Sequence, residues 1–163
     1  MSQPEKLQGG AMGGVEDLYR EVILDHFKAP KNRGVLPTAN AHAEGVNPLC
    51  GDQISMTALI ENDEVKDVKF AGHGCAISQS AASMLTQAVK GKPLSVVRQI
   101  TQAYKTLLGL GNSEGAPPPE ALGDLISLEG VKKYPVRIKC ALLSCNTLLQ
   151  GIEDFLNKRG GRP

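Results

Sequence analysis

The sequence predicts a small α+β domain, because one stretch has the period of strands and most of the remainder has the period of helices. Apolar and polar residues alternate over 53–61, and a second short run over 65–71 follows the polar turn at 61–64. Two such runs joined by a short turn are typical of an antiparallel hairpin. Elsewhere, apolar residues recur at every third or fourth position, which is the spacing of amphipathic helices.

The first part of the chain is expected to hold one helix and a short strand. Residues 1–14 contain two glycine pairs and few apolar side chains, which predicts a flexible leader. An apolar stripe predicts a helix over 15–28, which Pro30 and then Gly34 would end. The irregular stretch that follows has room for a short edge strand over 41–46.

Helices are expected after the hairpin. The first covers 76–90, and Pro93 opens a second that runs to about residue 108. Residues 109–119 have no periodicity and are rich in glycine and proline. This composition predicts a surface loop.

The end of the chain is expected to contain a short helix and then a long one. Asp124 can cap the short helix, which would stop at Gly130. Pro135 introduces the last helix, which would reach about residue 157 and leave a tail over 158–163. The chain is therefore expected to form a single domain over 15–157.

Composition excludes several classes of function. A chain of 163 residues suits one compact domain, and 18 Lys and Arg against 17 Asp and Glu give no basic surplus for nucleic acid or an anionic membrane. Tryptophan is absent, and no apolar run approaches the roughly 20 residues of a membrane-spanning helix. Since no signal-peptide core is present, we expect a cytoplasmic protein. Four cysteines in that compartment are more often metal ligands or reactive thiols than disulfides.

Residues 72–78, Gly-His-Gly-Cys-Ala-Ile-Ser, join the predicted hairpin to the helix that follows. The glycines on either side of His73 let the backbone turn sharply, including at positive φ. Cys75 is therefore expected at a helix N-terminus, where unpaired amides and the helix dipole favour a thiolate. A thiolate in this place suits a nucleophile or a metal ligand.

The apolar pattern of the last predicted helix indicates different roles for its two cysteines. Cys145 falls near the centre of the apolar stripe, whereas Cys140 lies roughly opposite, with Ser144 and Thr147. A free cysteine commonly behaves as a small apolar core residue, which is the expected role of Cys145. An exposed thiol at Cys140 would instead need a partner.

Cys50 and Asp52, separated by one glycine, can converge on one centre from a turn before the hairpin. With Cys75 and Cys140 they supply three thiolates and one carboxylate, a set that zinc accepts tetrahedrally. Soft thiolates equally suit iron–sulfur chemistry. Spacing alone leaves metal ligands and simpler roles open, because there is no Cys-x-x-Cys pair and an aspartate in a turn is often only a turn former.

The histidines give little support for a catalytic site. His26 lies on an apolar helix stripe and is expected to be packed, and His42 is expected in a loop. His73, two residues from Cys75, is the remaining candidate ligand. A Cys–His hydrolase would need a base aimed at the thiol and an oxyanion hole, which these residues do not supply.

Four segments resemble those of a known family. They are residues 18–34 (LYREVILDHFKAPKNRG), 47–52 (NPLCGD), 72–78 (GHGCAIS) and 137–141 (RIKCA). They are similar to the opening helix and the three ligand segments of the IscU/SufU/NifU N-terminal family of iron–sulfur cluster assembly proteins. The resemblance covers about 15–156 and implies a small three-stranded antiparallel sheet flanked by helices, with the site at one end.

Some features resemble the SufU branch more than the IscU branch. Lys139 stands where IscU proteins carry a histidine ligand, and the segment 102–123 resembles an insertion of SufU proteins. Residues 133–137, KYPVR, replace the IscU motif LPPVK that a dedicated Hsp70 pair recognises. The first two of these three differences imply a SufU-type protein.

A SufU-type protein is expected to bind zinc through Cys50, Asp52, Cys75 and Cys140. The resemblance also implies that it takes persulfide sulfur from the cysteine desulfurase SufS for delivery to SufBCD, as a carrier rather than a turnover enzyme. Cys50 is the expected acceptor, because it lies in a Pro/Gly turn where backbone motion costs little and because the resemblance points to the same position. The alternatives are a scaffold that assembles a transient [2Fe–2S] cluster or binds iron on these cysteines, and a structural zinc module.

Overall fold

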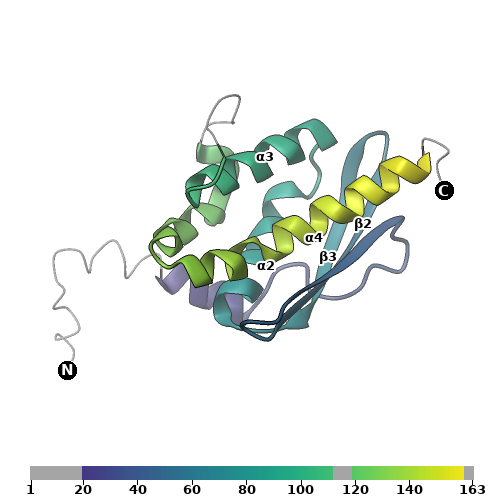
Figure 1. Ribbon diagram of the computed structural model, residues 1–163. Helices are drawn as coiled ribbons and strands as arrows, with labels where there is room; N and C mark the ends of the chain where they lie inside the picture. The colour runs from purple at the N-terminus through teal and green to yellow at the C-terminus, as the bar shows by residue number, and fades with distance from the viewer. Residues whose placement is uncertain (1–19, 112–118, 160–163) are drawn as a thin grey trace, which may run out of the picture.

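Helices cover one face of a three-stranded antiparallel sheet in this α+β protein, the fold that the family resemblance implied (Figure 1). A computed structural model describes residues 20–111 and 119–159, of which 20–28 are helical. The following elements, in chain order, are β1 (Ala41–Asn47), β2 (Asp52–Glu61), β3 (Glu64–His73), α2 (Ala76–Val89), α3 (Leu94–Leu107), η2 (Pro119–Lys133) and α4 (Pro135–Arg159).

The predicted hairpin is formed by β2 and β3. Its turn residues Asn62 and Asp63 both have positive φ, 53° and 58°, as in the tight turns that match the twist of a hairpin. A register shift near the turn leaves both Val65 and Val68 fully buried. On β2 the inward side chains alternate, and each is at most 3% exposed: Ile54, Met56, Ala58 and Ile60.

The predicted edge strand is confirmed as β1 and is one residue longer than expected. It pairs with β2 in the order β1-β2-β3, so that Asn47 at its end lies opposite Asp52 at the start of β2. The connection over 48–51 is a turn. It therefore carries Cys50 at one end of the sheet.

Helices α2 and α3 agree with the predicted ranges to within one residue at each end. The prediction of a short α-helix that Asp124 caps is wrong. Residues Pro119–Lys133 form a run of 3₁₀ turns with a kink at Gly123, and the Asp124 carboxylate bonds His26 instead of capping a helix. Most of the predicted loop lies outside the described residues, as does the leader over 1–14.

Helix α4 extends to Arg159, two residues beyond its predicted end at about residue 157. It packs on β1 and β2 and also contacts α2 and η2, so it is enclosed on more than one side (Figure 1). The expectation of an exposed polar face is therefore wrong. Cys140 and Ser144 are fully buried and Thr147 is 4% exposed, because this face meets other elements.

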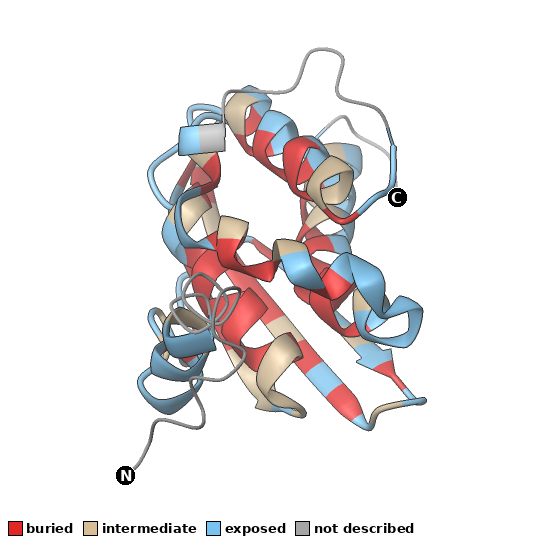
Figure 2. Ribbon diagram, turned by 90° about the vertical axis from the view of Figure 1, so that its left-hand side faces the viewer, coloured by how far each residue is buried: buried red, intermediate tan, exposed pale blue. Residues whose placement is uncertain are grey.

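The helical residues 20–28 are anchored to the rest of the domain by one buried side chain. The ring of His26 lies with Nδ1 2.7 Å from Ser83 Oγ on α2 and Nε2 2.8 Å from Asp124 Oδ2 on η2. Buried residues occupy the layer between helices and sheet in Figure 2. None of the described helices has the length and apolar character needed to cross a membrane.

Candidate metal centre

Three side chains that are distant in the sequence converge at the end of the sheet. The sulfurs of Cys50 and Cys140 and a carboxylate oxygen of Asp52 all lie within 4.8 Å of one another. The two sulfurs are 3.1 Å apart. The turn before β2, the first residue of β2 and the first turns of α4 thus supply one donor each.

Cys75 reaches this cluster through Asp52. Its backbone N–H donates to Asp52 Oδ1 at 2.8 Å, and its Sγ lies 3.7 Å from Oδ2 of the same carboxylate. All four predicted ligands therefore gather in one region, and the Asp52 carboxylate contacts Cys75 while it lies close to the other two sulfurs.

The strand-to-helix junction places Cys75 as the sequence predicted. Gly72 and Gly74 adopt φ of 137° and 152°, values that residues with a Cβ rarely adopt. Cys75 is the N-cap residue of α2, and its Sγ accepts from the N–H of Ser78 at 3.4 Å. One of the free amides of the helix end therefore points at this sulfur.

Gly74 also permits a close backbone approach. A Cβ built on it would lie 2.9 Å from Asp52 Cα and 2.9 Å from Ser78 Oγ, tighter than real contacts of a Cβ. The absence of a side chain at this position is what allows the Asp52 carboxylate to sit against the Cys75 amide.

Two polar neighbours of the cluster were not assigned a role from the sequence. Asn47 is 7% exposed and donates from Nδ2 to Cys140 Sγ at 3.6 Å. The negative charge of nearby thiolates, that of Cys75 above all, raises the pKa of the Arg137 guanidinium. The clue for Asn47 was its place in the segment NPLCGD, three residues before Cys50.

Burial and neighbouring donors make Cys140 a costly place for an isolated charge. Removal from water is the largest cause of the raised pKa of the Cys140 thiol, and the side chains of Cys50, Asp52 and Cys75 raise it further. A cation bound among these groups would offset that cost, since negative charges close together are stabilised by an opposite one. The donor set therefore favours a metal ion.

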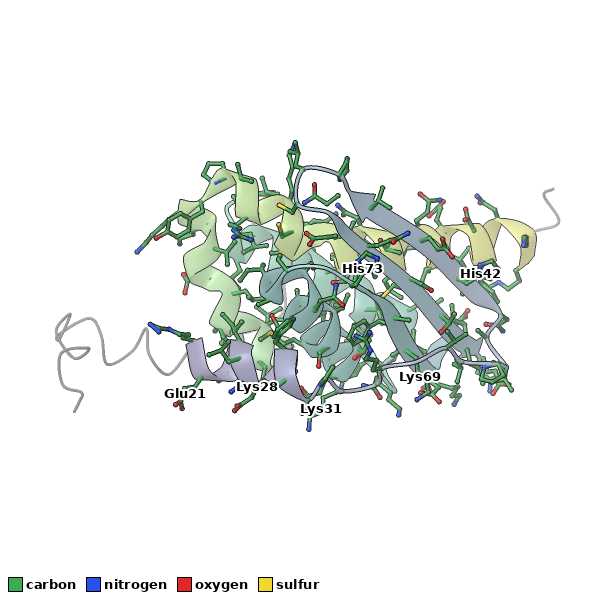
Figure 3. All side chains as sticks on the ribbon, turned by 90° about the horizontal axis from the view of Figure 1, so that it is seen from below. Glu21, Lys28, Lys31, His42, Lys69 and His73 are labelled. Carbon is green, nitrogen blue, oxygen red and sulfur yellow. The ribbon has the colours of Figure 1, made fainter. Side chains whose placement is uncertain are left out.

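None of the three histidines belongs to the group of donors formed by Cys50, Asp52 and Cys140. His26 is buried and hydrogen-bonded between α2 and η2, as described above, so its expected packing is confirmed. His42 lies on β1 rather than in a loop, and His73 is the exposed last residue of β3 (Figure 3). Among the residues that the structure describes, the group of metal-binding side chains within 4.8 Å contains no histidine.

The sequence matches the family described as NifU-like N terminal domain over residues 18–160. The chain belongs to this family. It is 41% identical over 140 residues to the "Zinc-dependent sulfurtransferase SufU" of Bacillus subtilis, covering 85% of this chain and 91% of that protein. It is 35% identical over 147 residues to the "Iron-sulfur cluster assembly scaffold protein IscU" of Streptococcus pyogenes, covering 90% of both chains.

Solved structures agree with this family. A scaffold protein for the SUF system from Fervidobacterium islandicum matches with a TM-score of 0.72 and 35% identity, over 80% of this chain and 93% of that one. A NifU-like N-terminal domain from Brucella abortus has a TM-score of 0.76 at 24% identity, over 88% and 98% of the two chains, and shares the fold. The family predicted from the four motifs is confirmed.

In this NifU-like domain Cys145 is separate from the cluster. It is fully buried in the apolar core, and burial raises the pKa of its thiol to about 12. We expect Cys145→Ala to keep the metal content of the wild type and to lower the free energy of unfolding by about 1–2 kcal/mol, as for a small buried side chain. Metal analysis and urea unfolding measure the two effects. A folded Cys145→Ala protein without metal would show that this thiol, too, serves the centre.

Proposed function

We propose that this chain is a zinc-dependent sulfur carrier of iron–sulfur cluster assembly, with Cys50 as the residue that accepts sulfur. The observation that supports this proposal most strongly is that Cys50 belongs to the donor cluster and also lies on a turn where it is only half-buried. Its Sγ lies 3.1 Å from the fully buried Cys140, while its neighbour Leu49 is 69% exposed. The names of the relatives described above support the same class of function.

Cys50 is better suited to receive sulfur than the other two thiols of the cluster. Cys140 is within a helix and has no exposed surface. Cys75 is held at the N-terminus of α2, and its backbone N–H donates a hydrogen bond to the Asp52 carboxylate. Cys50 lies in a turn that Gly51 continues at φ 69°, with open space around the glycine. Short turns of this kind change conformation at less cost than a packed helix.

Sulfur transfer at Cys50 needs no external oxidant or reductant. The Cys50 thiolate attacks the terminal sulfur of a persulfide on the donor protein, and a new S–S bond forms on Cys50 Sγ. The S–S bond of the donor breaks at the same time, and the donor cysteine leaves as a thiolate. One sulfur atom has moved, and the number of thiolates and persulfides is unchanged.

The donor set fits zinc, with Cys50, Asp52, Cys75 and Cys140 as the proposed ligands. Bound zinc would keep these thiolates deprotonated and add its binding free energy to that of folding. Three sulfurs and one carboxylate also suit a [2Fe–2S] cluster or iron. This chemistry makes a cluster scaffold, the role named for the IscU relative, the second candidate function.

The proposed partners are a cysteine desulfurase of the SufS type as donor and a SufBCD-type complex as acceptor. Incubation with SufS, pyridoxal phosphate and cysteine, followed by mass spectrometry of alkylated peptides, is the test. We expect one additional sulfur on the peptide that contains Cys50. The Cys50→Ala protein should still bind the desulfurase but accept no sulfur, because the attacking atom is missing.

The outcomes of this experiment are distinct. Sulfur on Cys75 or Cys140, with none on Cys50, would contradict the assigned acceptor. Protein isolated from its own host with a visible absorption band and stoichiometric iron and sulfide would favour the scaffold, since zinc is colourless. Zinc without any persulfide after incubation would leave only a structural metal site.

A further inference from the structure

Asn47 connects the three residues whose donor atoms converge at the end of the sheet. Its backbone C=O accepts from the Cys50 N–H at 3.2 Å, within the turn that carries this cysteine. As the last residue of β1 it pairs with Asp52, the first residue of β2. Its side-chain Nδ2 donates to Cys140 Sγ on α4 at 3.6 Å, in a buried hydrogen bond. One residue thus joins the turn, the sheet and the helix at the candidate metal centre.

The N–H donors at the centre are distributed unequally among its three sulfurs. Cys75 Sγ accepts from the N–H of Ser78 at 3.4 Å, and Cys140 Sγ accepts from the Asn47 amide. In the described part of the chain, no N–H is hydrogen-bonded to Cys50 Sγ, which instead contacts Cys140 Sγ at 3.1 Å. A hydrogen bond to a thiolate stabilises its charge and reduces the electron density that the sulfur can donate. Cys50 is therefore the thiolate left free to react.

The short distance between Cys50 and Cys140 creates a side reaction that a sulfur carrier must suppress. The Cys140 thiolate can attack Cys50 Sγ, the inner sulfur of a persulfide formed there. A Cys50–Cys140 S–S bond then forms and the S–S bond of the persulfide breaks. The terminal sulfur leaves with the electron pair of that bond and takes a proton from water, as hydrosulfide. No oxidant or reductant is consumed, and the carried sulfur is lost.

We propose that Asn47 is a positioning residue that protects the carried sulfur, because its amide N–H holds Cys140 Sγ as a ligand and weakens it as a nucleophile. The inference rests on the proposed carrier function. Asn47 is 7% exposed and its backbone is bound in β1 and in the turn, so its amide is held against the sulfur. The charges of all three thiolates raise the pKa of the Arg137 guanidinium, so this cation acts on every sulfur and does not distinguish them as the amide does.

Cobalt spectroscopy tests the hydrogen bond in the full-length chain without any sulfur transfer. Co²⁺ bound in place of zinc gives a sulfur-to-metal charge-transfer band in the near ultraviolet. In Asn47→Leu, which fills the space of the amide without an N–H, this band should move to longer wavelength, because the sulfur then gives up electron density more readily. Zinc affinity should fall by roughly 10–100-fold. Asn47→Gln keeps an N–H donor and should remain closer to the wild type in both measurements.

Asn40→Leu is the matched control. Asn40 lies immediately before β1, and its side chain makes two hydrogen bonds to the backbone of Ile60, far along the strand from the cysteines. Its replacement removes structural hydrogen bonds of the same strand, so stability should fall while the cobalt band and zinc affinity stay those of the wild type. Circular dichroism checks the fold of each variant. Asn47→Ala, a smaller change that also removes the donor, replaces Asn47→Leu if the latter does not fold.

The protective role is measured on zinc-loaded protein that has received sulfur from the desulfurase and been separated from it. Asn47→Leu should release hydrosulfide about tenfold faster than the wild type, as expected for the loss of one hydrogen bond to a charged group. Peptide mapping should then show a Cys50–Cys140 disulfide. Asn47→Gln and Asn40→Leu should release hydrosulfide at close to the rate of the wild type.

The hydrogen bond, the protective role and the proposed function can fail separately. An unchanged cobalt band in a folded donorless variant, or an equal shift in Asn47→Leu and Asn47→Gln, would overturn the role of the amide. A shifted band without faster release of hydrosulfide would contradict protection of the carried sulfur. Wild-type protein that takes no sulfur on Cys50 would contradict the carrier function, and the cobalt band would still show whether Asn47 acts on a ligand.

Discussion

Replacing Cys140 with alanine should remove stoichiometric zinc and lower the free energy of unfolding of the zinc-loaded protein by roughly 3 kcal/mol or more. Cys140 is fully buried and its Sγ lies 3.1 Å from that of Cys50. Its loss removes a proposed ligand and leaves the Asn47 amide without the sulfur that accepts from it. Because the binding free energy of a metal is also folding free energy, both quantities should fall together.

Ser144→Ala is the matched control for this variant. Ser144 lies one turn further along α4, is equally buried, and its hydroxyl has no hydrogen-bond partner among the described residues. Removing an unsatisfied buried hydroxyl costs little, so zinc and stability should remain close to those of the wild type.

Metal analysis and urea unfolding with and without a chelator measure the effects of both variants. The chelator should destabilise the wild type and Ser144→Ala but have little effect on Cys140→Ala. Zinc bound by Cys140→Ala with the affinity of the wild type would contradict the ligand assignment. Cys75→Ala should behave as Cys140→Ala does, since its sulfur contacts the Asp52 carboxylate of the same cluster.

The sequence was sufficient wherever local rules determine the structure. Alternation of apolar residues predicted the hairpin of β2 and β3, and the two glycines around His73 predicted the junction that places Cys75 at the start of α2. Both features depend on residues close together in the chain. The gathering of Cys50, Asp52 and Cys140 depends on the packing of α4 against the sheet. Spacing left a metal site open among other roles, and the resemblance to a family decided for it in advance.

Features set by tertiary contacts were the ones that local patterns missed. A helical stripe identifies one buried face, but α4 is enclosed on more than one side, so the polar face with Cys140 is buried too. Aspartate is a residue type that often caps helices, but the carboxylate of Asp124 is hydrogen-bonded to His26, which is distant in the sequence. The 3₁₀ turns of η2 have three residues per turn and give no helical period to detect.

Gly74→Ala should weaken zinc binding by roughly 10–100-fold without removing a ligand, which is the usual cost of disturbing groups that orient ligands. The new Cβ would lie 2.9 Å from Asp52 Cα and equally close to Ser78 Oγ, and φ of 152° disfavours alanine as well. Relief of these contacts must move Asp52 away from the Cys75 amide that holds its carboxylate. Geometry alone would then account for the lost affinity.

Gly91→Ala separates this effect from backbone strain. Gly91 has φ of 81° with nothing within 4 Å of a built Cβ, so alanine there meets only the strain of a positive φ, about 1–2 kcal/mol. Competition with a chromogenic zinc chelator should give wild-type affinity for Gly91→Ala and weak binding for Gly74→Ala. Both variants introduce backbone strain at a positive φ, but only Gly74→Ala adds close contacts with Asp52. Equal zinc affinity in the two variants would therefore show that the close approach of Gly74 to Asp52 does not position the carboxylate.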